Sequence, residues 1–254
     1  MGTARSRAVV SGAVAAVVAG GVYRVLRARP RRRWQRTNYA GRTVDLYAGP
    51  AVALGTVAAI AVLPLPARTK YAAALAVLAA GGCGAYDDLV GGGDPRRGFR
   101  AHLGALRGGE VTSGAVKLLG IGTAGLVAGT LIEERPVDRI LAGVVIAATA
   151  HLVNLTDVRP AAAAATVLAL GAPGLPTTAL AAAPMGAAAA LVTDDLGERT
   201  MIGDTGAHAL GAALGVAVVA GRGRAGLVAH AVGLVVATVH GDRVSRLVRE
   251  LWDR

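Results

Sequence analysis

Three short stretches of the sequence place acidic or amide side chains beside apolar segments. Asp87 and Asp88 stand together in "GAYDDLVG", directly after a run of almost pure Ala, Leu, Val and Gly. Asn154 and Asp157 stand three apart in "NLTD", a spacing that puts them on one helix face. Asp204 follows a glycine in "MIGDTGA". A doubled negative charge at the end of an apolar helix opposes the helix macrodipole, so it needs a reason.

Carboxylates held at one depth of a membrane repel one another unless a cation neutralises them. All-oxygen ligands suit a hard ion such as Mg²⁺, and Mg²⁺ at a membrane surface suits a phosphate or diphosphate substrate. Lys117 would bring a compact ammonium to such a phosphate, in a chain with two lysines and 25 arginines. Plain structural interpretations also stand: solvated helix ends, an interhelical hydrogen bond, a helix cap and an interfacial lysine.

The composition indicates which elements must position these groups. The chain has 254 residues, of which 54% are hydrophobic and 17% charged, below the roughly 25% charged residues of an average soluble domain. The charges cluster, which is typical of a polytopic membrane protein. Aromatic residues make up 3%, which argues against a stacking surface for nucleic acid. Cys83 is the single cysteine, so no internal disulfide forms.

We expect an all-α bundle in which residues 1–254 form a single membrane domain with about nine transmembrane helices. The nine apolar segments lie near 8–26, 48–65, 70–86, 114–132, 137–154, 160–172, 177–193, 205–220 and 224–240. Small residues four apart, such as Gly211 and Gly215, would let helices pack closely. A GC-rich coding bias is an equally good explanation of the many Ala and Gly residues.

The distribution of basic residues predicts the orientation. With the N-terminus outside, 19 of the 27 Lys and Arg residues fall on inner loops and eight on outer ones, as the positive-inside rule requires. The C-terminus is then cytoplasmic, in a multi-pass protein of the cell membrane. Orientation accounts for much of the net charge of +11, which argues against nucleic-acid binding. The three polar stretches all meet the inner side.

Several stretches, in this order, resemble the polyprenyl-phosphate N-acetylhexosamine-1-phosphate transferase family. This family includes the phospho-N-acetylmuramoyl-pentapeptide translocase and the GlcNAc-1-phosphate transferases. The matching stretches are "RTNYAGRTVDLYAG" (36–49), "GAYDDLVG" (84–91), "GFRAHLGALRGGEVTSGAVKLLGIG" (98–122), "NLTDVRP" (154–160) and "MIGDTGAHALGAALG" (201–215). Together the ordered "DD", "NLTD" and "GDTG" are a specific signal.

The resemblance implies a reaction and a set of site residues. A polyprenyl phosphate, undecaprenyl or decaprenyl, attacks the β-phosphate of a UDP-sugar, and UMP leaves. Asp204 and Asn154 would hold Mg²⁺. The catalytic residues would be Asp87, Asp88, Asp157 and Lys117, with the aspartate pair beside the metal and the lysine steadying a phosphate.

Substrate binding would fall to Arg96, Arg97 and Arg199 on the cytoplasmic side, because arginine pairs well with diphosphate oxygens. Other partners would be membrane lipids, and a homodimer or an envelope-assembly partner protein is compatible with the sequence. The chain departs from the family in three places. It has Gly91 where a lysine is usual, Pro160 where the translocase has an aspartate, and no His-rich loop near its C-terminus. It would therefore be a shortened member.

Two other functions remain open at this stage. A non-catalytic relative would bind polyprenyl phosphate or act as a scaffold in cell-envelope synthesis. The same acidic residues are compatible with that role. A transporter would use an intramembrane cation site, but its ionisable residues are expected near the bilayer midplane rather than at helix ends.

Overall fold

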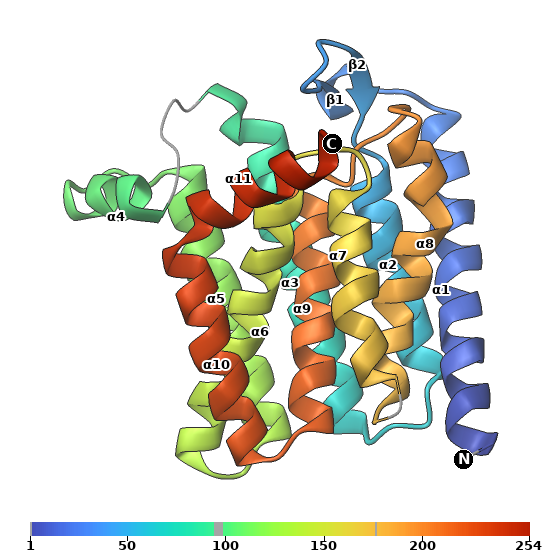
Figure 1. Ribbon diagram of the computed structural model, residues 1–254, viewed down its shortest axis with the longest axis vertical. Helices are drawn as coiled ribbons and strands as arrows, with labels where there is room; N and C mark the ends of the chain where they lie inside the picture. Colours follow the sequence, from blue (N-terminus) through green and yellow to red (C-terminus); the bar gives the residue numbers. More distant parts are fainter. Residues whose placement is uncertain (1, 94–98, 176) are drawn as a thin grey trace.

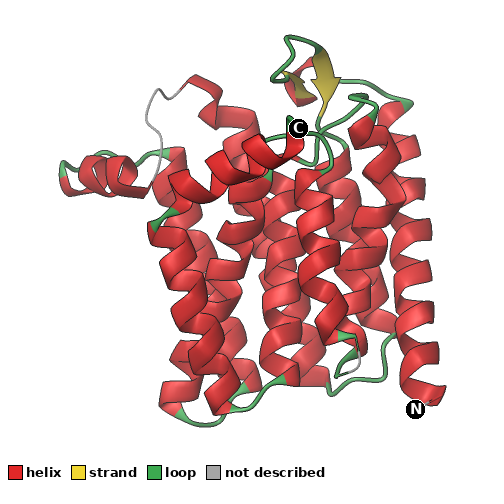
Figure 2. Cartoon of the chain, viewed as in Figure 1, coloured by secondary structure: helices red, strands yellow, loops and turns green. Residues whose placement is uncertain are grey.

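Nine helices run back and forth between two ends of a bundle (Figures 1 and 2) in a computed structural model that describes residues 2–93, 99–175 and 177–254. They are α1 (Gly2–Arg27), α2 (Ala48–Val62), α3 (Ala67–Val90), α5 (Ser113–Ile132), α6 (Pro136–Thr156), α7 (Ala162–Gly171), α8 (Ala182–Leu196), α9 (Gly203–Gly221) and α10 (Arg224–Val239). Each predicted apolar segment lies mainly on one of them. The predicted all-helical fold is confirmed.

The remaining elements gather mainly at one end. They are η1 (Arg32–Trp34), β1 (Gln35–Thr37), β2 (Thr43–Asp45), η2 (Gly91–Gly93), α4 (Phe99–Arg107), η3 (Ala172–Gly174), η4 (Ala179–Ala181) and α11 (Gly241–Trp252). Strands β1 and β2 pair antiparallel in a small hairpin. We call this end of the bundle the hairpin end. The C-terminus lies at the hairpin end and the N-terminus at the opposite end (Figure 1).

The helices indicate a multi-pass membrane protein. Among the described residues, six helices are long and apolar enough to cross a bilayer, and a seventh span results if α10 and α11, bent by 81°, count as one. Helix α2 has 15 residues and α7 has 10, fewer than the ~20 residues of an untilted span. The structure therefore supports six or seven spans by length and composition.

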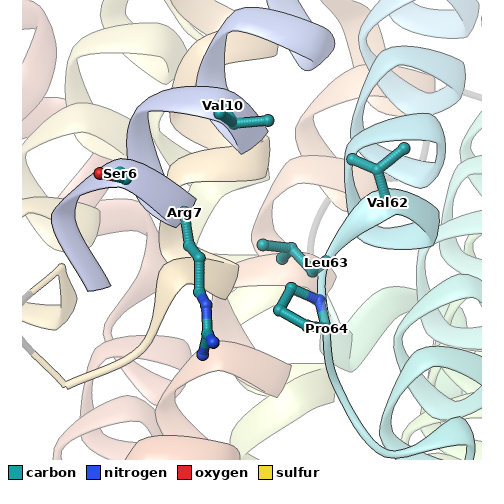
Figure 3. Close-up of a pocket in the computed structure, with 6 residues that line it drawn as sticks. All are labelled: Ser6, Arg7, Val10, Val62, Leu63 and Pro64. Atoms are coloured by element: carbon teal, nitrogen blue, oxygen red, sulfur yellow. The ribbon is translucent and has the colours of Figure 1, made fainter. Parts of the chain in front are cut away.

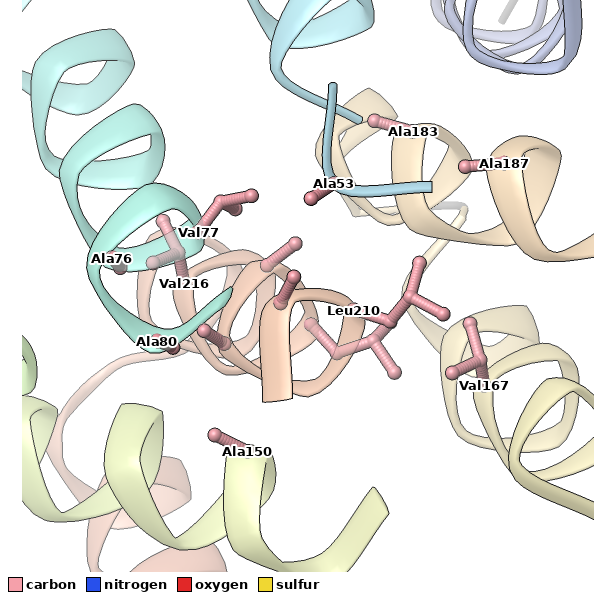
Figure 4. Packing of buried hydrophobic residues seen from close by; sticks show 14 of the residues in the cluster. Ala53, Ala76, Val77, Ala80, Ala150, Val167, Ala183, Ala187, Leu210 and Val216 are labelled. Carbon is pink, nitrogen blue, oxygen red and sulfur yellow. The ribbon is translucent and has the colours of Figure 1, made fainter. Parts of the chain in front are cut away.

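Helix α9 is the centre of the bundle. Of its apolar window 83% is buried, against 22% to 50% for the other candidate spans. Figure 4 shows Leu210 and Val216 of α9 packed among small side chains such as Ala53, Ala80 and Ala150. The outer helices instead turn large apolar side chains outward, as at Val17 of α1, which is 75% exposed. An apolar outer surface of this kind suits lipid rather than water.

Close helix packing depends on glycine at defined places. A Cβ on Gly211 would lie 2.6 Å from the Cα of Ala150, and a Cβ on Gly215 would lie 2.6 Å from the Cα of Ile146. The spacing of four therefore brings the backbones of α9 and α6 together, as the sequence predicts.

The hairpin holds the loop that leads into α9. The Asn38 amide donates a hydrogen bond to Glu198 at 2.6 Å, and Arg42 forms an ion pair with Glu198 at 3.3 Å. The carbonyl of Asp45 accepts a hydrogen bond from the backbone N–H of Met201 at 2.8 Å. An N-terminal element therefore fixes where the central helix begins.

Candidate functional site

A shared ammonium joins two of the predicted aspartates at the hairpin end. The Nζ of Lys117, near the start of α5, lies 2.7 Å from the Asp87 carboxylate at the end of α3. The same Nζ contacts the carboxylate of Asp204 at the start of α9. The three side chains are 19% to 24% exposed, so water reaches them in part. We call Asp87, Asp88, Asp157 and Asp204 the acidic cluster.

Asp88 contacts a different part of the protein from Asp87. Its carboxylate accepts hydrogen bonds from the backbone N–H groups of Asp204 at 3.1 Å and Thr205 at 2.9 Å, and from the Thr205 hydroxyl at 2.6 Å. Ile202, the residue before α9, has no side-chain group that caps the helix. The end of α3 thus caps the start of α9 and places negative charge at the positive end of its macrodipole.

Two glycines allow this contact. A Cβ on Gly84 would overlap the carbonyl oxygen of Asp204, so α3 and α9 meet backbone to backbone there. Gly203 has φ of +61°, a left-handed conformation that glycine adopts without strain. These two positions let the carboxylates of Asp87 and Asp88 reach the first turn of α9.

Asp157 lies just beyond α6, not on it. The helix ends at Thr156, and the Asp157 N–H donates to the carbonyl of Asn154 at 3.1 Å. The expectation that Asn154 and Asp157 share a helix face is therefore wrong. Burial raises the pKa of Asp157 well above its usual range, and the nearby carboxylates of Asp195, Asp204 and Asp88 raise it further.

Of the predicted substrate-binding arginines, Arg199 lies among the described residues, and its contacts do not reach the acidic cluster. The Nε of Arg199 is 2.8 Å from the carboxylate of Asp194, and its side chain is 48% exposed. None of the contacts among the described residues joins Arg199 to the cluster. Arg96 and Arg97 lie outside the described residues.

The structure adds residues that the motifs do not single out. Ser113 lies beside Asp87, and a Cβ on Gly91 would overlap the Asp87 carboxylate. A Cβ at position 91 would therefore require the Asp87 carboxylate to move. The Nδ1 of His208, 2% exposed, is 2.7 Å from the carbonyl oxygen of Asp204.

A further cation, Arg36 of β1, reaches the same end of α3. A Cβ on Gly92 would lie 3.8 Å from an Arg36 guanidinium nitrogen. The side chain is half-buried and donates to the backbone carbonyl of Gln35. Arg36 opens the matching stretch 36–49, but the sequence alone does not place it beside the acidic cluster.

The acidic cluster fits Mg²⁺ in part. Among the residues that the structure describes, no group of three or more His, Cys, Asp or Glu is arranged to hold a metal. Mg²⁺ nevertheless needs only one or two protein carboxylates when waters and substrate phosphates complete its shell. Asp87 and Asp204 are two such carboxylates in mutual contact. The Asn154 side chain makes no hydrogen bond within the described residues.

A pocket elsewhere does not belong to this site. Figure 3 shows it between the start of α1 and the end of α2, lined by Ser6, Arg7, Val10, Val62, Leu63 and Pro64. It lies at the end of the bundle opposite the hairpin, so it plays no part in the chemistry of the acidic cluster.

No protein-family model matches this chain, and no curated protein matches it. The functional assignment therefore depends on the motifs and on the geometry of the acidic cluster.

Proposed function

We propose that this protein transfers a sugar-1-phosphate from a UDP-sugar to a polyprenyl phosphate, in cell-envelope glycan synthesis. One observation carries the proposal: Lys117 bridges Asp87 and Asp204 where α3 ends and α5 and α9 begin. A lipid phosphate reaches such a place from the bilayer, and a nucleotide sugar reaches it from the cytosol. An oxygen of the lipid phosphate bonds to the β-phosphorus, the bond from that phosphorus to the bridging oxygen breaks, and UMP leaves.

The roles of the residues follow from their contacts. Lys117 holds a phosphate as a point charge, and Asp87 orients that lysine. Asp88 is a positioning residue, because both of its carboxylate oxygens already hold the first turn of α9. Asp204 and Asn154 would hold Mg²⁺, which when bound stabilises the charge that develops on the transferring phosphoryl group. Asp157 is a further carboxyl group beside them, and its raised pKa favours its protonated form.

Cationic groups at the hairpin end would bind the diphosphate of the UDP-sugar. We assign this role to Arg36, which lies beside Gly92. Arg96, Arg97 and Arg199 stay predictions from the sequence. Arginine pairs diphosphate oxygens well but reads little of a sugar, so selectivity for one sugar is expected to be low unless a partner protein covers the site.

The proposal includes an orientation. We infer nine membrane passes with the N-terminus outside and the hairpin end in the cytoplasm. The short helices α2 and α7 would cross where the bilayer is locally thinned. The count of 19 inner against eight outer basic residues supports this orientation.

A non-catalytic relative is the second candidate, and one observation favours it. Lys117 already neutralises Asp87 and Asp204, and three donors satisfy Asp88, so the acidic cluster is a closed network of ion pairs and hydrogen bonds. Such a network would bind polyprenyl phosphate through Lys117 without turning over a nucleotide sugar.

The deciding experiment uses the purified full chain with Mg²⁺, undecaprenyl phosphate and a panel of UDP-sugars. UMP release that falls by orders of magnitude in Asp204→Ala, but not in the exposed Asp242→Ala, would support the transferase, because each 1.36 kcal/mol of lost barrier stabilisation is tenfold. Lipid-phosphate binding without UMP release would support the non-catalytic relative. The absence of both lipid-phosphate binding and UMP release would contradict both candidate functions.

A further inference from the structure

Helix α11 does not continue the bundle. It follows α10 after a bend of 81°, so it lies almost perpendicular to the candidate membrane spans and across the hairpin end (Figure 1). A helix in this place, at the end of apolar helices, runs parallel to the membrane plane. That is the position of an interfacial helix.

Contact with the bundle covers only part of the apolar surface of α11. Gly241 is buried, and the Ser245 hydroxyl donates to the carbonyl of Leu155 at 2.7 Å. Val244 and Val248, one turn apart, are half-buried. Leu247 and Leu251 continue the apolar stripe beyond this contact and are each 56% exposed. The uncovered leucines lie on the flank of the helix rather than over its outer side, because successive residues turn by about 100°.

Positive charge borders the exposed leucines. Arg243, about one turn before Leu247, and Arg246, its neighbour in sequence, are exposed on the side away from the bundle, with the exposed Glu250 between them facing water. Arginine beside an apolar stripe places its stem along the acyl boundary and its guanidinium at the headgroup phosphates. Trp252, 41% exposed at the end of the helix, is a residue type enriched at membrane interfaces. This pattern of charge complements an anionic lipid surface.

The far end of α11 is fastened to the turn that follows α6. The indole N–H of Trp252 donates to the carbonyl of Pro160 at 2.9 Å, and the guanidinium of Arg159 pairs with the carboxylate of Asp253 at 2.7 Å. That turn begins at Asp157 of the acidic cluster. Helix α11 is therefore joined to the turn that carries Asp157.

We propose that α11 docks on an anionic lipid surface, with Leu247 and Leu251 at the acyl boundary and Arg243 and Arg246 at lipid phosphates. The proposal does not depend on the proposed transferase activity, because its residues lie outside the acidic cluster.

The test uses the full chain with Cys83→Ala as background. A single cysteine at Leu247→Cys, or at the exposed Glu250→Cys as the control, carries an environment-sensitive fluorophore. Each protein is placed in nanodiscs of phosphatidylcholine, with or without one-third phosphatidylglycerol. We expect acrylamide to quench the label at position 247 several-fold less than the label at position 250. Phosphatidylglycerol should increase this protection.

The charge requirement is tested in Arg243→Gln/Arg246→Gln. Each arginine near an anionic surface shifts the docked-to-free ratio by about fivefold, so this variant should lose the response to phosphatidylglycerol. Equal quenching at positions 247 and 250, or the same quenching in both lipids, would overturn the proposal. Excimer emission from pyrene labels at position 247 would also overturn it, because a second copy would then cover this flank.

Discussion

Replacing Lys117 with methionine is the sharpest test of how the acidic cluster is balanced. Methionine keeps most of the side-chain length and removes the charge, so Asp87 and Asp204 then face each other without the ammonium between them. The folded protein should lose stability, and an added divalent cation should restore part of it.

The magnitude follows from the geometry. Breaking a fully buried ion pair by removing one partner costs about 3–5 kcal/mol. The three side chains here are 19% to 24% exposed, and water screens them in part, so we expect about 2–4 kcal/mol. Mg²⁺ at ten times its dissociation constant would return about 1.4 kcal/mol.

The assay is thermal unfolding of the purified protein in detergent, with and without Mg²⁺. Lys70→Met is the matched control, because Lys70 is the other lysine and its Nζ donates to the backbone carbonyl of Ala61 in an exposed place. The control should unfold close to the wild type in both conditions. An unchanged melting temperature for Lys117→Met, or a lower one that Mg²⁺ does not raise, would refute this account of the cluster.

Two further predictions concern helix packing and orientation. Gly84→Ala should cost about 1–3 kcal/mol, because its Cβ would overlap the carbonyl of Asp204, whereas Gly82→Ala on the same helix meets open space and should be tolerated; equal melting temperatures would contradict this. Single cysteines at Arg33→Cys and Gly223→Cys, in a cysteine-free background, should label from opposite sides, with position 33 protected in intact cells. Labelling of both from outside would exclude the proposed orientation.

Long elements were predictable from the sequence because their signal is local. Uninterrupted apolar runs predict membrane helices from hydropathy alone, and each of the nine lies on a helix in the structure. The hairpin 35–45 and the short helices α4 and α11 were not predicted. Such elements are too short or too polar to show in a hydropathy pattern. The hairpin and α11 also contact distant parts of the chain, whereas α4 packs against the neighbouring α5.

The division of labour between Asp87 and Asp88 could not be predicted. Adjacent residues on a helix point about 100° apart, so one carboxylate faces Lys117 of α5 and the other faces the start of α9. Which neighbour each one meets depends on how three helices pack. The same limit applies to Asp157, because nothing in "NLTD" alone shows that α6 stops at Thr156.

The capping of α9 by Asp88 also has a consequence for the order of assembly in time. The two partners are 117 residues apart in sequence, and the hairpin contact between Asn38 and Glu198 spans 160. A chain inserted from its N-terminus therefore carries the unmatched acids of α3, and an unanchored hairpin, through most of synthesis. The acidic cluster is completed only when α9 enters among helices already in place, which makes the central helix the last part of the site to arrive.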